Sequence, residues 1–139
     1  MSSIATSTIS QENKSAPDYL FYEKKMPDET NADSPIKLLG GTQGAIEVVI
    51  EVGATGVTLA NGKVLTFTLK YDTSAAGSFT NGIVLYTKTA SGDSTIAAGT
   101  ELARFAIPRG IGPYFKLNVA TDDTNETGTF IAYPAYVAR

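Results

Sequence analysis

The stretch KVLTFTLKY at residues 63–71 decides the fold class of this chain. Polar and apolar side chains alternate along it, so that Leu65, Phe67 and Leu69 share one face and threonines occupy the other. A period of two residues is that of a β-strand with one buried face. Threonine, being β-branched, suits the exposed side of a pleated strand. We therefore predict a strand here whose apolar face lies in a core.

The same pattern recurs on both sides of this strand. Residues 46–52 place Ile and Val on one face and Glu47, Val49 and Glu51 on the other. The pair Asn61-Gly62 lies between two apolar runs and is a hairpin signal. Further strands are expected at residues 83–87, 101–107, 114–119 and 129–137. Roughly six to eight short strands with Gly, Asn and Pro between them are typical of an antiparallel β-sandwich or jelly roll.

Residues 1–35 differ in composition from the rest of the chain. They are rich in Ser, Thr and Asn, contain three prolines, and carry six acidic and three basic residues, which accounts for the whole net charge of −3. Such a composition is typical of a segment that becomes ordered against a surface. The predicted organisation is therefore a partly extended N-terminal arm at residues 1–35, followed by an all-β sandwich domain at residues 36–139.

Two aromatic segments are candidates for partner contact. The arm contains the cluster Tyr19-Leu20-Phe21-Tyr22, which is either an anchor for a partner surface or an N-terminal strand docked on its own sheet. The last predicted strand is apolar on both faces, which indicates either core packing or an edge that meets another chain, and Pro134 favours the edge. The predicted contact residues are Tyr19, Phe21, Tyr22, Tyr133 and Tyr136.

The residue types that carry most enzyme chemistry are missing. The chain contains no His and no Cys, which removes the commonest general base, the commonest transition-metal ligand and all thiol chemistry. Glu47 and Glu51 share one strand face about 13 Å apart by the strand rise, beyond the separation of a glycosidase pair. The acidic segment at residues 122–126 lacks the spacing of a calcium loop and is interpreted as a turn. We predict no catalytic residue, no cofactor and no metal.

Charge and hydropathy exclude two further classes of partner. A pI of about 4.8 without clustered Lys or Arg argues against nucleic acid. No apolar run approaches the length of about 18 residues that a membrane helix needs, and the N-terminus lacks the features of a signal peptide. We therefore expect a protein that is made in a cytoplasm and neither binds nucleic acid nor enters a membrane.

Four segments, in order and spacing, resemble the small jelly-roll cement (decoration) proteins of short-tailed phages. They are residues 66–74 with Phe79, 102–108, 114–118 and 128–132. The resemblance implies a virion protein on the outer capsid surface, synthesised in the host cytoplasm, which bridges major capsid protein subunits and self-associates as a dimer or trimer. The alternative is a carbohydrate-binding β-sandwich displayed on a virion, suggested by seven Tyr and many Thr, although Trp is absent.

Overall fold

The computed structural model describes residues 19–38, 46–124 and 127–136. This part of the chain is all-β, with antiparallel sheets and no helix. The strands are β1 (Phe21–Lys25), β2 (Asn31–Asp33), β3 (Lys37–Leu38), β4 (Ile46–Val52), β5 (Val57–Leu59), β6 (Val64–Asp72), β7 (Asn81–Thr89), β8 (Ser94–Ile96), β9 (Glu101–Ala106), β10 (Tyr114–Thr121) and β11 (Thr129–Tyr136).

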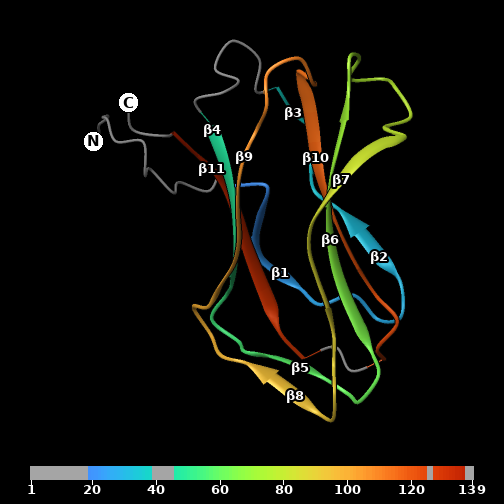
Figure 1. Cartoon of the computed structure of the whole chain (residues 1–139), viewed down its shortest axis with the longest axis vertical. Coiled ribbons are helices and arrows are strands. Elements are labelled where there is room, and N and C mark those ends of the chain that lie inside the picture. The colour runs from blue at the N-terminus through green and yellow to red at the C-terminus, as the bar shows by residue number, and fades with distance from the viewer. Residues whose placement is uncertain (1–18, 39–45, 125–126, 137–139) are drawn as a thin grey trace.

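The strands form two main sheets that face each other as in a β-sandwich (Figure 1). Sheet A has the order β1-β11-β4-β9, and sheet B has the order β2-β10-β6-β7, with β3 also paired to β10. The short strands β5 and β8 pair with each other at one end of the molecule. Strands that follow one another along the chain therefore often lie in opposite sheets.

A single apolar core lies between sheets A and B. Each sheet contributes the face that the alternating pattern predicted to be buried, and the two faces pack against each other. Sheet A contributes Phe21, Ile46, Val48, Ile50, Val52, Phe130 and Ala132, and sheet B contributes Leu65, Phe67, Leu69, Phe115, Leu117 and Val119.

The prediction of a hairpin at Asn61-Gly62 is wrong, although a turn does form there. Lys63 N–H donates to the carbonyl of Ala60 at 3.0 Å, but β5 then pairs with β8, while β6 pairs with β7 and β10. The turn is held instead by the segment after β7, because Gly62 N–H donates to Ala90 and Gly92 N–H donates to the Asn61 side chain. Tertiary hydrogen bonds have replaced the ladder that a hairpin would have supplied.

Two strands of the predicted arm, β1 and β2, pair with strands of the domain that was predicted to begin at residue 36. β1 pairs with β11 in sheet A, and β2 pairs with β10 in sheet B. β2 and β3 lie on either side of the expected boundary and pair with the same strand. The docked-strand hypothesis therefore describes residues 21–25, because Leu20 and Phe21 are buried in the core that the downstream strands build. Residues 1–18 lie outside the described residues.

β11 is not an edge strand, which corrects the expectation based on Pro134. It lies between β1 and β4 over residues 129–132. Pairing of β1 with β11 ends at Ala132, whose carbonyl accepts from Leu20 N–H at 2.8 Å. Pro134, which has no N–H to donate, follows the end of this pairing and stays in register with Val48 of β4 on the other side.

Candidate functional site

Three of the five predicted contact residues form an aromatic cluster on the outer face of sheet A. The ring centroids of Tyr19 and Tyr22 are 4.8 Å apart, and those of Tyr19 and Tyr133 are 6.1 Å apart in an edge-to-face arrangement. Tyr22 is 60% exposed, whereas Tyr133 is only 4% exposed. The Tyr133 hydroxyl donates to the Glu51 carboxylate at 3.0 Å. The cluster therefore presents one exposed ring, Tyr22, which packs against Tyr19, and Tyr19 in turn packs against the buried Tyr133.

A second small apolar cluster explains why β11 is apolar on both faces. Phe130 and Ala132 point into the main core, while Tyr133 and Ala135 point outward and pack with Val49 of β4. Val49 has no exposed surface, although the sequence pattern placed it on the solvent side. Since residues directly opposite each other in an antiparallel pair share a face, the pairing of Tyr133 with Val49 produces this cluster.

The other two predicted contact residues are placed differently. Phe21 pairs with Ala132 and is 3% exposed, so its side chain fills the chain's own core. Tyr136 ends β11 opposite Ile46, and its side chain lies outside the described residues. Phe21 and Tyr22 are neighbours in the sequence but lie on opposite faces of β1, because successive side chains of a strand alternate.

Charged side chains of β4 and β9 lie beside the aromatic cluster on the same face. Arg104 of β9 donates to the carboxylates of Glu101 and Glu47, each at 2.9 Å. The hydrogen bond to Glu101, and then that to Glu47, raise the pKa of the Arg104 guanidinium above its ordinary value. Glu51 is held by Tyr133. This face thus carries an aromatic cluster and, beside it, three glutamates, two of which hold Arg104 by hydrogen bonds.

The described acidic residues that the sequence singled out have structural partners. Glu47 is bound to Arg104 and Glu51 to Tyr133, so these two do not form a pair. Asp122 and Asp123 accept backbone N–H groups of Val64 and Ala60, which ties the segment after β10 to the start of β6. Over the described ranges, no three His, Cys, Asp or Glu side chains are close enough together to hold a metal ion.

The outer face of sheet B carries a polar network that the sequence did not reveal. The Asn118 amide group donates to Asn31 at 3.0 Å and to Asp33 at 2.8 Å, and Lys116 Nζ donates to Asp33 at 3.1 Å. Burial alone would raise the pKa of Asp33, but the hydrogen bonds from Asn118 and Lys116 outweigh it and hold this pKa below its ordinary value. The network joins β2 to β10.

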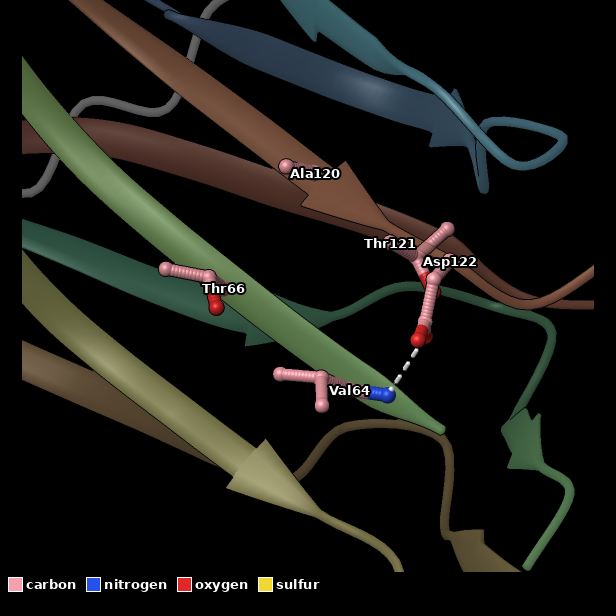
Figure 2. Close-up of a pocket in the computed structure, with 5 residues that line it drawn as sticks. All are labelled: Val64, Thr66, Ala120, Thr121 and Asp122. Carbon is pink, nitrogen blue, oxygen red and sulfur yellow. Dashed lines mark hydrogen bonds between the residues drawn. The ribbon is translucent and has the colours of Figure 1, made fainter. Parts of the chain in front are cut away.

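Beside this network lies a shallow hollow of about 270 Å³ (Figure 2). It is lined by Val64 and Thr66 of β6 and by Ala120, Thr121 and Asp122 at the end of β10. The Asp122 carboxylate accepts the Val64 N–H at 2.8 Å at its border. The sequence analysis did not identify this site. Its one sequence feature is a small residue, Ala120, among larger ones, and only the pairing of β10 with β6 and β2 shows which residues lie beside Ala120.

Comparison with known proteins leaves the family open. No protein-family model matches the chain, and no curated protein is significantly similar to it in sequence. Within residues 19–38, 46–124 and 127–136, the structure has no helix of the length and hydropathy that crossing a membrane requires.

Proposed function

We propose that this chain is a capsid cement protein of jelly-roll type, which binds the outer surface of an assembled phage capsid and stabilises it by bridging major capsid protein subunits. The observation that carries the proposal is the strand order. The orders are β1-β11-β4-β9 and β2-β10-β6-β7. In each sheet the strand that comes first in the chain lies beside one of the last two strands, and the chain passes repeatedly from one sheet to the other. This order supports a jelly roll, which is built from two Greek keys and is the fold that the resemblance to cement proteins implies.

The outer face of sheet A is the proposed capsid contact, because it has the features of a protein interface. Interfaces concentrate binding energy in a few aromatic and arginine side chains surrounded by a polar border. Tyr22 is the open aromatic side chain of this face, and Arg104 lies beyond Val49 on the same row of the sheet. Tyr19 packs against the Tyr22 ring and is itself packed against Tyr133, so less side-chain freedom is lost when a partner binds.

Repetition makes a modest contact effective on a capsid. Each copy needs only a contact of standard size, because many symmetry-related copies act on the same shell and their contributions add. Copies that also contact one another add a second set of contacts. The proposed partners are therefore the major capsid protein and further copies of this chain.

Co-sedimentation with purified, undecorated capsids tests this function. The wild-type chain is expected to pellet with the shells, and Tyr22→Ala is expected to weaken binding by about 2 kcal/mol or more, the scale of an interface hot spot. Val84→Ala is the matched control, since Val84 is 59% exposed on the opposite sheet. Absence of wild-type binding would reject the function, whereas binding that Tyr22→Ala leaves unchanged would reject sheet A as the contact.

A further inference from the structure

We propose that the hollow on the outer face of sheet B is a binding site for a single neutral sugar ring. The site is independent of the capsid contact, because it lies on the outer face of the other sheet. Its lining combines the apolar side chains of Val64 and Ala120 with the hydrogen-bonding side chains of Thr66, Thr121 and Asp122 (Figure 2). Sugar rings present the same two kinds of surface, C–H groups on the ring faces and hydroxyl groups around the edge.

The register of sheet B creates the floor. Ala120 pairs with Thr66 on one side and with Asn31 on the other, and Thr66 pairs with Thr87. These four residues form one row across the outer face, in which Ala120 has the shortest side chain. The row therefore dips at Ala120, and Val64 extends the apolar floor along β6.

The border supplies both donors and acceptors of hydrogen bonds. The hydroxyl groups of Thr66 and Thr87 are 3.1 Å apart, so one donates to the other and the second O–H is left to donate to a ligand. Asp122 uses one carboxylate oxygen to accept Val64 N–H, and its other oxygen can accept from a sugar hydroxyl.

Size and charge restrict the ligand class. The volume of about 270 Å³ lies just below the usual range for drug-sized ligands, which limits the site to about one ring. The charged group in the lining is the Asp122 carboxylate, which would repel acidic sugars and phosphates. A neutral pyranose that donates hydroxyls to a carboxylate fits both constraints. A contact of this size predicts a Kd on the order of a few millimolar.

Amide chemical shifts measured by NMR test the site. The probes are the methyl glycosides of glucose, galactose and N-acetylglucosamine, together with maltotriose to distinguish a terminal ring from one within a chain. Sorbitol is the control ligand, because it carries the hydroxyls of a hexose without the ring. At least one glycoside is expected to shift the amides of Thr66, Ala120 and Asp122 in a saturable manner, whereas sorbitol is expected to leave them unchanged.

Two variants and one matched control decide the outcome. Ala120→Leu fills the floor and is expected to raise the Kd about tenfold or more, and Asp122→Asn removes a charge-assisted bond and is expected to raise it about fivefold. Ala106→Leu makes the same change at an exposed position of sheet A and is expected to bind as the wild type. No saturable shift with any of the four sugars, an equal response to sorbitol, or undiminished binding by Ala120→Leu would each overturn the proposal.

Discussion

Phe67 of β6 and Phe130 of β11 meet edge to face across the two sheets, with ring centroids 4.9 Å apart and ring planes at 84°. Both side chains have no exposed surface. Since β6 belongs to sheet B and β11 to sheet A, this contact joins the two layers at the centre of the core. The interaction energy of this aromatic pair is therefore one contribution to the packing of the two sheets against each other.

A double-mutant cycle on this pair is expected to show coupling. Phe67→Leu and Phe130→Leu each remove a ring from a close-packed site, so each should destabilise the protein. The double variant should lose about 0.5–1.5 kcal/mol less than the sum of the single changes, because the ring contact is lost only once. Urea unfolding of the four proteins measures the coupling. Additive losses would show that the two rings contribute independently.

Substitution by Ala is expected to reduce stability strongly at Phe21 and hardly at all at Tyr22. Phe21→Ala removes a buried ring and should lower the free energy of unfolding by about 3–5 kcal/mol. Tyr22→Ala alters an exposed side chain and should change stability by about 0.5 kcal/mol or less. Thermal unfolding of both variants gives the comparison. A Tyr22→Ala variant as unstable as Phe21→Ala would mean that the exposed ring is structural.

Tyr133→Phe isolates the hydrogen bond between Tyr133 and Glu51. The ring stays in place against Val49 and Tyr19, while the hydroxyl that donates to Glu51 is removed. The expected loss of stability is about 0.5–1.5 kcal/mol, the usual net contribution of such a bond. Tyr22→Phe is the control and should leave stability unchanged. Equal effects of the two substitutions would argue against a contribution from this hydrogen bond.

Asp33 is expected to make stability sensitive to acid. Its pKa in the folded protein is held below the ordinary value of 3.8, mainly by Asn118 and Lys116, against the opposing effect of burial. The stabilisation is therefore fully present above pH 3.8 and is lost as the pH falls through the lowered folded value. Because the ion pair is substantially exposed, we expect a contribution of under about 1 kcal/mol. The stability difference between wild type and Asp33→Asn, followed by urea unfolding, should shrink on acidification. A constant difference would contradict this linkage.

Gly128 is expected to tolerate no side chain. Its φ is +132°, and an added Cβ would lie 2.9 Å from the Cα of Val57. Gly128→Ala should therefore cost about 2–5 kcal/mol from backbone strain and overpacking together. Gly62→Ala is the control, since Gly62 also has a positive φ, +82°, but nothing lies within 4 Å of its added Cβ. It should cost only about 1–2 kcal/mol. Equal melting temperatures for the two variants would show that contact with Val57 has no effect.

The strands that sequence patterns predicted are those with several residues of alternation. β4, β6, β9, β10 and β11 lie close to their expected ranges, and β7 extends the expected range of 83–87 by two residues at each end. β2, β3, β5 and β8 have only two or three residues each. Such short strands show too little alternation to be recognised. They form because a neighbouring strand supplies hydrogen-bond partners, which a local pattern does not report.

The candidate sites were less predictable than the strands. Tyr19, Tyr22 and Tyr133 were identified as aromatic residues in unusual positions, and the structure brings them together on one face. The same reasoning grouped Phe21 with them, although it lies in the core. The hollow at Ala120 was missed, because it depends on which residues of β6 and β2 lie beside a small side chain.

By itself the sequence determined that the chain is all-β, because period-two alternation is a local property that each strand carries within its own residues. It also determined which side chains are missing, His and Cys among them. Only the tertiary structure decided the order of strands in the sheets, the burial of Val49 on an outer face and the position of the hollow. These depend on contacts between residues far apart in the chain, such as Tyr133 with Val49 and Ala120 with Asn31. Alternation assigns a side chain to one of two faces, but the neighbouring strands decide what that face meets.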